Sequence, residues 1–331
     1  MSRQIDLTLG VNGAFITRRW EQPDNWMRLT SELGYPAHEF CGDVIDPFFS
    51  GDRDYQMQTA AEVKTAAEKY NITITDIYTG VATHRFHGLS HSNRSCRERM
   101  KQWIYDTMDL AKQMGADRVG GHWDAISVEV MADKQAYDSA VDALCDTFVE
   151  IANVGAEKGM GAVYLEQMYI PSEAPWTIEQ AEYILININK QKPAIPVYLT
   201  IDVGHMAGMV YGLQGEDLDY RAWLRRLAGF AEIIHLQQTS PDGSHHWPFT
   251  EQFNARGHIS MDAVMDSLQE GYAAAADSPI VEVMEPVDHA FLIAEIIPGS
   301  TKHEDPLLEE LKISADYLKQ WLPDGRLTVR V

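Results

Sequence analysis

The stretch from residue 197 to residue 205, VYLTIDVGH, is an apolar, strand-like run that ends in an acid and an imidazole, Asp202 and His205. Three further runs carry an isolated acid or imidazole in the same way: AVYLEQMY (162–169, Glu166), EIIHLQQTS (232–240, His235) and AFLIAEIIPG (290–299, Glu295). Burying a charged group in such a run is costly unless something pairs with it. Carboxylates that meet at neighbouring strand ends repel one another, and a divalent cation removes that repulsion. The sequence therefore predicts a metal site at one end of a parallel barrel.

Short apolar runs alternate with longer amphipathic segments along nearly the whole chain, which is typical of βα units. Strands are expected near residues 5–11, 37–42, 72–80, 117–123, 161–169, 197–205, 232–238 and 290–299, and helices near 26–33, 57–70, 94–114, 134–158, 178–190, 261–276 and 305–322. Eight such units predict a (β/α)8 TIM barrel, with one domain over residues 1–331. The main alternative is a doubly wound sheet, which would normally show a glycine-rich turn after its first strand. The segment LGVNGAF (9–15) contains neither GxGxxG nor GxxxxGK[ST].

The eighth strand has two candidates in the sequence. IVEVMEP (280–286) contains Glu282 and Glu285, and AFLIAEIIPG (290–299) contains Glu295. The second run leads through a short loop into a well-patterned final helix, which completes a normal βα unit. We therefore prefer Glu295 as the acid that the eighth strand contributes to the site.

Composition excludes several classes of protein. The 331 residues are 45% hydrophobic and 23% charged, which supports a substantial core. A formal net charge of -22 argues against nucleic-acid partners and against acidic membranes. The three cysteines form no CxxC pair, and no signal peptide or membrane span is evident. A cytoplasmic location is the expectation that follows.

The order LEQ, IDVGH, IHLQQ and a final-strand AE resembles that of the xylose-isomerase-like barrels over nearly the whole chain. That superfamily contains sugar isomerases, sugar 3-epimerases, hydroxypyruvate isomerase, inosose-processing enzymes and an endonuclease branch. The resemblance implies that the metal ligands are Glu166, Asp202, His235 and Glu295. Carboxylates with one imidazole form a hard site that suits Mn²⁺, Mg²⁺ or Co²⁺, and zinc is a further candidate.

The resemblance also implies substrate-binding residues. His205 matches the substrate-binding histidine of the D-x-x-H motif, and His122 lies where many members have a histidine facing the substrate. Trp123 is a candidate because an aromatic ring suits the apolar face of a sugar. The segment HHWPF (245–249) after strand seven is expected to bring His245, His246 and Trp247 near the same face of the barrel. Arg256 is a candidate for clamping a hydroxyl or a phosphate, but the favoured interpretation is that it caps the following helix or pairs with an acid.

Two further features bear on the site. The loop THRFHGLSH (83–91) carries His84, Arg85, His87 and His91, which could line the pocket or form a polar surface loop. The family often has an Asp two or three residues after the histidine of strand seven, where this chain has Gln237 and Gln238. That departure leaves a supporting or second-metal role at this position open.

A metal-dependent sugar isomerase or epimerase is the function that we expect, acting on a small, free sugar or keto-sugar. The cation would make a C–H bond beside the carbonyl acidic, and Glu166 and Glu295 would act as the acid/base pair. No lysine stands beside the four ligand strands, which favours proton transfer over hydride transfer. The alternatives are a metal-dependent dehydratase or lyase on a cyclitol or keto-sugar, and a non-catalytic sugar-binding barrel. A homo-oligomer is compatible with the long helices, by analogy with related barrels.

Overall fold

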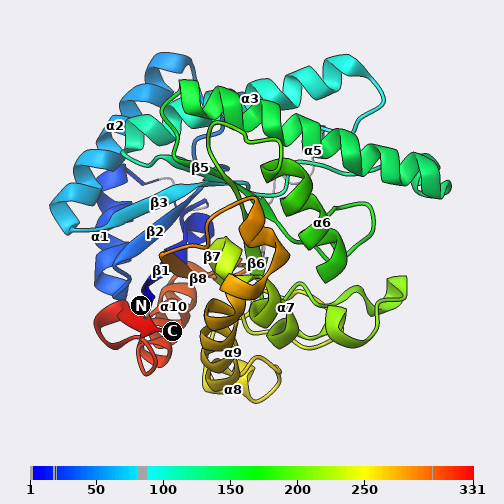
Figure 1. Ribbon diagram of the computed structural model, residues 1–331. Helices are drawn as coiled ribbons and strands as arrows, with labels where there is room; N and C mark the ends of the chain where they lie inside the picture. Colours follow the sequence, from blue (N-terminus) through cyan, green and yellow to red (C-terminus); the bar gives the residue numbers. More distant parts are fainter. Residues whose placement is uncertain (1–2, 18, 20, 81–87, 300) are drawn as a thin grey trace.

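A closed barrel of parallel strands forms the centre of the molecule, with helices around it (Figure 1). The computed structural model describes residues 3–17, 19, 21–80, 88–299 and 301–331. The barrel strands are β1 (Gln4–Asn12), β2 (Ala37–Cys41), β3 (Thr73–Tyr78), β4 (Arg118–Gly120), β5 (Ala162–Glu166), β6 (Val197–Asp202), β7 (Ala231–Leu236) and β8 (His289–Ala294). The barrel closes because β1 pairs in parallel with both β8 and β2. The predicted (β/α)8 TIM barrel is thereby confirmed.

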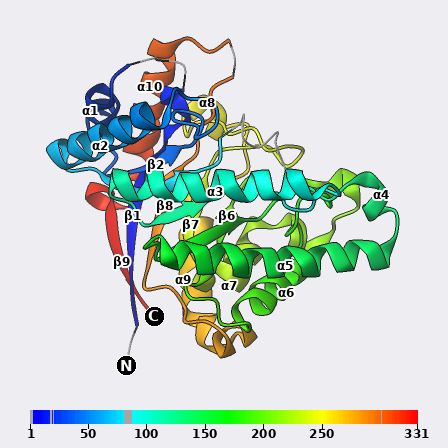
Figure 2. The ribbon, with the colours of Figure 1, turned by 90° about the horizontal axis from the view of Figure 1, so that it is seen from above.

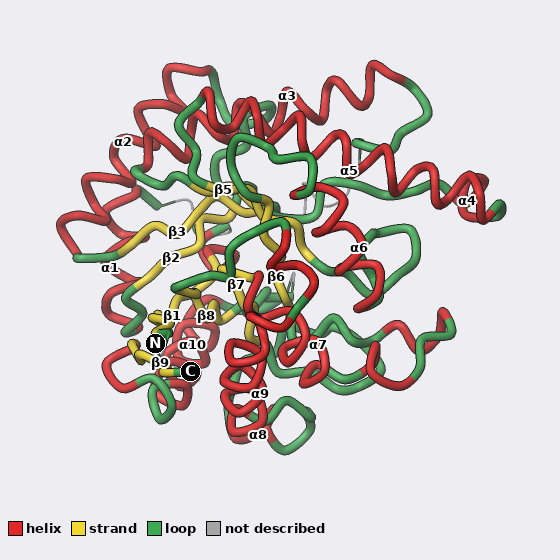
Figure 3. Tube along the Cα trace, in the orientation of Figure 1, coloured by secondary structure: helices red, strands yellow, loops and turns green. Residues whose placement is uncertain are grey.

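The helices surround the strands as an outer layer, so that in Figure 3 the strands lie inside a ring of helices. They are α1 (Pro23–Leu33), α2 (Arg53–Tyr70), α3 (Arg94–Met114), α4 (Val128–Met131), α5 (Lys134–Glu157), α6 (Ile178–Asn189), α7 (Tyr220–Leu227), α8 (Glu251–Asn254), α9 (Met261–Ala274) and α10 (Glu304–Leu318). The main apolar core lies between this layer and the outer face of the barrel. Among the described residues, no helix is both long and apolar enough to cross a membrane.

The long helices begin and end at residues whose chemistry favours those positions. The side chains of Asn93, Asp133, Thr177 and Ser260 each accept a hydrogen bond from a backbone N–H in the first turn of α3, α5, α6 and α9 respectively. Gly115 ends α3 with a left-handed conformation (φ 90°) that a glycine adopts without strain. These local signals are why the predicted bounds of α3 agree with the structure.

The interior of the barrel is filled in layers, because alternate residues of each strand point inward. Tyr164, Ile233 and Ile293 form an apolar layer inside the barrel. Glu166, His235 and Glu295 each follow one of these three residues by two positions, so they point to the same side of their strands. The site residues are therefore the next inward-facing layer, at the carboxyl ends of the strands, which is where functional groups gather in such barrels.

An additional strand, β9 (Arg326–Arg330), pairs antiparallel with β1 on the outside of the barrel, as Figure 2 shows. The backbones of Arg3 and Val331 exchange two hydrogen bonds of 2.9 and 3.0 Å, so the two chain ends meet. The sequence analysis did not predict β9, and it also missed α7. The choice of strand eight was correct, because residues 289–294 form β8 whereas Pro279–Glu282 form a 3-10 turn.

Candidate metal centre and active site

Four side chains at the carboxyl ends of β5 to β8 converge on one point. One ligand atom from each of Glu166, Asp202, His235 and Glu295 lies within 4.8 Å of the others. Nδ1 of His235 is 3.3 Å from Oε1 of Glu166 and 3.2 Å from Oε2 of Glu295. The strand register contributes directly, since Asp202 of β6 is paired with His235 of β7. The structure therefore brings together all four residues that the sequence singled out as ligands.

Burial and opposite charge compete for the pKa of each group in this cluster. Burial alone would lower the pKa of His235, but the carboxylates of Glu295 and Glu39 raise it well above its usual value. Burial would raise the pKa of Glu295, yet His235 and His246 hold it well below its usual value. At Asp202 burial prevails and raises the pKa to about 6. The negative charge of the carboxylates in this cluster is thus balanced by the neighbouring imidazoles.

The residues present fit a divalent cation. Nδ1 of His235 and Oε2 of Glu295 are buried, and neither has a hydrogen-bond partner among the described residues, although they lie 3.2 Å apart. Nε2 of His246 also lies 3.3 Å from Oε2 of Glu295. Buried polar atoms normally make hydrogen bonds, so two such atoms facing one point are suited to bind a further group. Three carboxylates and one imidazole are the donors that Mn²⁺, Mg²⁺ and Co²⁺ accept. The identity of the ion stays a prediction.

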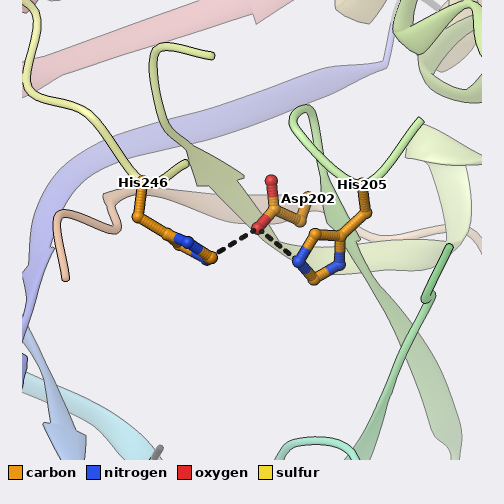
Figure 4. A group of neighbouring side chains, drawn as sticks. All are labelled: Asp202, His205 and His246. Carbon is orange, nitrogen blue, oxygen red and sulfur yellow. Dashed lines mark ion pairs between the residues drawn. The ribbon is translucent and has the colours of Figure 1, made fainter. Parts of the chain in front are cut away.

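A second group of side chains shares Asp202 with the first (Figure 4). Asp202, His205 and His246 each offer one ligand atom within 4.8 Å of the other two. Nε2 of His205 is 3.3 Å from Oδ2 of Asp202, and Nε2 of His246 is 3.9 Å from the same oxygen. Nδ1 of His205 lies 2.9 Å from the backbone oxygen of Gln167, which fixes the ring with Nε2 toward Asp202.

Two glutamines hold Asp202 in place. Nε2 of Gln237 donates to both carboxylate oxygens of Asp202, at 3.0 and 2.9 Å. Its Oε1 accepts a hydrogen bond of 2.7 Å from the backbone N–H of His246. Oε1 of Gln167 accepts from the backbone N–H of Asp202 at 2.8 Å. Gln237, where the family often has an Asp, thus supports the ligand Asp202 and links it to the loop that carries His246. Gln238 instead anchors this loop through Asn254 and the backbone oxygen of Ile259.

A cavity of about 410 Å³ opens onto the cluster. Its walls combine charged groups of the site with small, polar and apolar side chains. The lining residues are Asn12, Ala14, Thr17, Cys41, Asp43, Thr79, Gly80, Glu166, Met168, Tyr169, His205, His246, Glu295, Ile297 and Pro298. A space of this size and mixed character suits a small polar molecule.

The structure brings only one of the four predicted substrate contacts to the cavity wall, namely His205. Trp123 is buried in the outer core, where its ring stacks on Phe148 at 5.7 Å. Arg256 is exposed and lies over the ring of Trp247 at 4.6 Å. His122 is buried but is not among the described residues that line the cavity. Strand β4 ends at Gly120, so the alternation of side chains along a strand does not decide where His122 and Trp123 point.

Only the end of the polar loop THRFHGLSH (83–91) lies within the described residues. His84, Arg85 and His87 lie outside the described residues. His91 is exposed, and its Nδ1 accepts a hydrogen bond of 3.0 Å from the backbone N–H of Asn93. Of the four residues that could line the pocket or form a surface loop, the structure places only His91, which lies at the surface.

Two buried acids were not singled out from the sequence, one that contacts the site and one on the neighbouring strand. Glu39 is an acid inside the apolar strand β2 and contacts His235, with Oε1 2.9 Å from Nε2. Asp76 is likewise a fully buried acid in β3. Each is an isolated acid in an apolar run, which is the pattern that identified the four ligands. Neither was recognised from the sequence. His246 belongs to the segment HHWPF (245–249), which was expected near this face of the barrel, but its contact with Asp202 was not expected.

Comparison with known proteins gives the family. The model of the family described as xylose isomerase-like TIM barrel matches residues 27–284. A curated relative, D-erythrulose 1-phosphate 3-epimerase of Brucella abortus (strain 2308), is 25% identical over 315 residues, which cover 93% of this chain and 99% of the relative.

Two solved structures share the fold. A candidate xylose isomerase from Rhodospirillum rubrum superposes with a TM-score of 0.80 at 20% identity and covers 95% of this chain and 99% of its own. D-psicose 3-epimerase from Clostridium cellulolyticum H10 superposes with a TM-score of 0.63 at 15% identity, covering 95% of this chain and 98% of its own. Since the family match spans most of the barrel, the chain belongs to the xylose isomerase-like TIM barrel family.

Proposed function

We propose that the protein is a divalent-metal-dependent 3-epimerase of short ketoses that works by carboxylate-mediated proton transfer. The observation that carries the proposal is the placement of Glu166 and Glu295 on β5 and after β8, both lining the cavity and both beside Nδ1 of His235. Two carboxyl groups that reach one cavity from different strands can serve the two faces of one carbon. The name of the curated relative, a sugar 3-epimerase, supports the same class of enzyme.

The ligand set for the cation would be Glu166, Asp202, His235 and Glu295. When bound, the cation would polarise the ketose carbonyl and make the neighbouring C–H bond more acidic. One of the two glutamate carboxylates then accepts the proton from C3. The other glutamate, in its protonated form, donates a proton to the opposite face of the same carbon. The two roles exchange in the reverse direction, so the pair suits a reversible epimerisation.

The remaining polar groups of the cavity orient the substrate. His205 and His246 face the cavity from the loops after β6 and β7, with ring centroids 6.0 Å apart. Their rings form part of the cavity wall, where they can contact the hydroxyl and carbonyl oxygens of a substrate. Met168 and Tyr169 supply part of an apolar wall, and the ring of Tyr169 packs edge-on against His205 at 5.1 Å. Such a wall suits the carbon backbone of a short sugar and helps to exclude water.

The substrate class is a short ketose in free or phosphorylated form. The sequence analysis favoured a free sugar, whereas the relative is named for a tetrulose phosphate. D-erythrulose 1-phosphate is therefore the first substrate to test, alongside free tetruloses, pentuloses and hexuloses. The cation is proposed to be Mn²⁺, Mg²⁺ or Co²⁺ because oxygen donors predominate.

Deuterium incorporation tests this proposal. The purified protein is incubated with Mn²⁺ and each ketose in D₂O, with an EDTA control, and the products are read by mass spectrometry and NMR. A new epimer that carries one deuterium at C3, and that EDTA abolishes, is the expected result. A new isomer without deuterium would instead favour hydride transfer, and loss of water would favour the dehydratase. Binding of sugar without turnover and without any effect of EDTA would support a non-catalytic barrel.

A further inference from the structure

A buried carboxylate stands directly behind the imidazole of the proposed metal site. Glu39 of β2 and His235 of β7 are both fully buried, and Oε1 of Glu39 is 2.9 Å from Nε2 of His235. The other ring nitrogen of His235, Nδ1, faces Glu166 and Glu295. The imidazole of His235 therefore lies between Glu39 on one side and the carboxylates of Glu166 and Glu295 on the other.

The second carboxylate oxygen of Glu39, Oε2, contacts the side-chain amide of Asn12, whose orientation is fixed. Oδ1 of Asn12 accepts a hydrogen bond of 2.8 Å from the backbone N–H of Ala14. This turns the amide nitrogen of Asn12 toward Glu39, and Nδ2 lies 2.5 Å from Oε2. Since an amide nitrogen only donates, the group beside it must accept. A backbone N–H thus fixes the orientation of the Asn12 amide, so Oε2 of Glu39 accepts from Asn12 and Oε1 contacts Nε2 of His235.

We propose that Glu39 is a positioning residue that selects the tautomer of His235 required for metal binding. In its ionised form Glu39 can only accept, so Nε2 of His235 then carries the proton and Nδ1 presents its lone pair toward Glu166 and Glu295. The reverse tautomer would point an N–H at the cation and leave two acceptors facing each other at Glu39. The inference rests on the proposed function only in assuming that a cation binds at this cluster.

Asp76 shows that burial of an acid in this barrel does not by itself create such a contact. It lies on the neighbouring strand β3 and is fully buried, and its Oδ1 accepts from Oγ1 of Thr75 at 2.5 Å. Its Oδ2 has no hydrogen-bond partner among the described residues. Burial raises the pKa of Asp76 well above its usual value. Asp76→Asn is therefore a nearly isosteric and neutral control for a change at Glu39.

The test is isothermal titration of Mn²⁺ and Zn²⁺ into the wild type, Glu39→Gln and Asp76→Asn. A glutamine at position 39 must turn its NH₂ either toward Asn12, opposing two donors, or toward His235, forcing the wrong tautomer. The affinity of Glu39→Gln is therefore expected to fall about 10- to 100-fold, the range found for partners of metal-bound histidines. Asp76→Asn is expected to bind as the wild type does. Equal affinity of a folded Glu39→Gln, judged by circular dichroism, overturns the role of Glu39.

A double variant separates tautomer selection from general damage to the core. When Asn12→Asp is combined with Glu39→Gln, the new carboxylate at position 12 would accept from both the Ala14 N–H and the glutamine NH₂. The glutamine oxygen would then accept from Nε2 of His235, as Glu39 does. Most of the lost affinity is expected to return. A double variant that binds as weakly as Glu39→Gln, or more weakly, contradicts the proposal.

A measurement on the wild type needs no variant. In the Zn²⁺-loaded protein labelled with ¹⁵N-histidine, long-range ¹H–¹⁵N correlations are expected to show His235 protonated at Nε2 and bound through Nδ1. Protonation at Nδ1 would overturn the inference. Failure of the wild type to bind any divalent ion would reject the proposed metal function itself, whereas wild-type binding with unchanged affinity in Glu39→Gln rejects only the role of Glu39.

Discussion

Neighbouring acids of the site have different proton affinities because their surroundings differ. Burial would raise the pKa of Glu166, but the imidazoles of His235 and His205 lower it. The pKa of Glu295 is lowered in the same way, and further, by His235 and His246. Asp202 has less compensation, and burial raises its pKa to about 6. The lowered pKa values favour the carboxylate form of both groups, which is the form that removes a proton from carbon. The glutamate that acts as donor must therefore take up a proton before it delivers one to the opposite face.

Replacing either proposed proton carrier by its amide is expected to stop catalysis without unfolding the barrel. Glu166→Gln and Glu295→Gln keep the shape of the side chain but remove its basicity, and kcat is expected to fall about 10²- to 10⁴-fold. Activity is compared at matched metal content, so that weaker metal binding is not mistaken for lost proton transfer. Glu282→Gln, an exposed glutamate outside the cluster, serves as the control. Wild-type turnover in either variant would remove that residue from the mechanism.

Metal binding is expected to weaken as the pH falls. The pKa of His235 in the metal-free protein is raised well above its usual value by Glu295 and Glu39, against the effect of burial. A cation that uses Nδ1 must displace a proton there, so affinity drops by about tenfold per pH unit for each proton displaced. Titration calorimetry from pH 6 to 8 measures this slope, and buffers of different ionisation enthalpy count the protons released. Affinity independent of pH would exclude His235 as a ligand.

At the scale of secondary-structure elements, the barrel strands position the site through their register. Asp202 pairs with His235, and Leu236 pairs with Ala294, so that Glu295 follows at the same level. A change of one residue in register would turn these side chains out of the barrel. The site is for this reason a property of β5 to β8 together rather than of any one segment.

The assignment of strand eight makes a direct prediction for three glutamates. Metal affinity is expected to be lost in Glu295→Ala and retained in Glu282→Ala and Glu285→Ala. Glu282 and Glu285 are exposed and lie before β8, outside the ligand cluster. Calorimetric titration of the three variants with Mn²⁺ distinguishes them. Loss of binding in Glu282→Ala alone would mean that the strand is wrongly assigned.

Elements with strong local signals could be predicted from the sequence, and elements that depend on distant partners could not. The bounds of α3 (Arg94–Met114) were predicted in full because a capping residue and a glycine mark its ends. By contrast, β9 (RLTVR) is only five residues long and exists through its pairing with β1 at the other end of the chain. The short helix α7 lies between 3-10 turns, where periodicity has too few residues to be read.

The same distinction applies to the site. Glu166, Asp202, His235 and Glu295 could be found because each is an isolated polar group in an apolar strand. His246 could be placed near the same face of the barrel, but its contact with Asp202 could not be predicted. Its loop is folded by Gln237 and by a backbone bridge between Gln238 and Trp247. Trp123 was expected at the cavity and instead packs in the outer core, because the residues after β4 leave the strand geometry.

At the scale of the whole molecule, the buried cluster connects metal content to stability. Without a cation, three carboxylates lie together inside the barrel beside the imidazoles of His205, His235 and His246. A bound ion stabilises the folded state by mass action. At a free ion concentration of about 100 times Kd this contributes about 2.7 kcal/mol, which corresponds to a rise in Tm of roughly 5 °C. Calorimetry with Mn²⁺ and with EDTA measures the difference. Asp202→Asn, which weakens the ligand set, is expected to show a smaller response, and an equal response would place the ion elsewhere.

The raised pKa of His235 also gives the metal-free protein a pH dependence of the opposite sign to that of metal binding. Burial alone would lower this pKa, and Glu295 with Glu39 raise it. The stabilisation is fully present below about pH 6.5, the unfolded pKa of histidine, and is lost as the pH rises through the folded pKa. Urea unfolding of the EDTA-treated protein is expected to show a falling free energy of unfolding above that pH. The loaded protein should not show this fall.

The pairing of β9 with β1 has a mechanical consequence. Because Arg3 and Val331 are hydrogen-bonded neighbours at one end of an antiparallel ladder, tension applied between them peels the ladder open from that end. The hydrogen bonds break one after another instead of sharing the load, so the first rupture requires little force. Optical tweezers should record a low-force extension as β9 detaches, and only afterwards a larger event as β1 is pulled from β8 and β2 and the barrel opens.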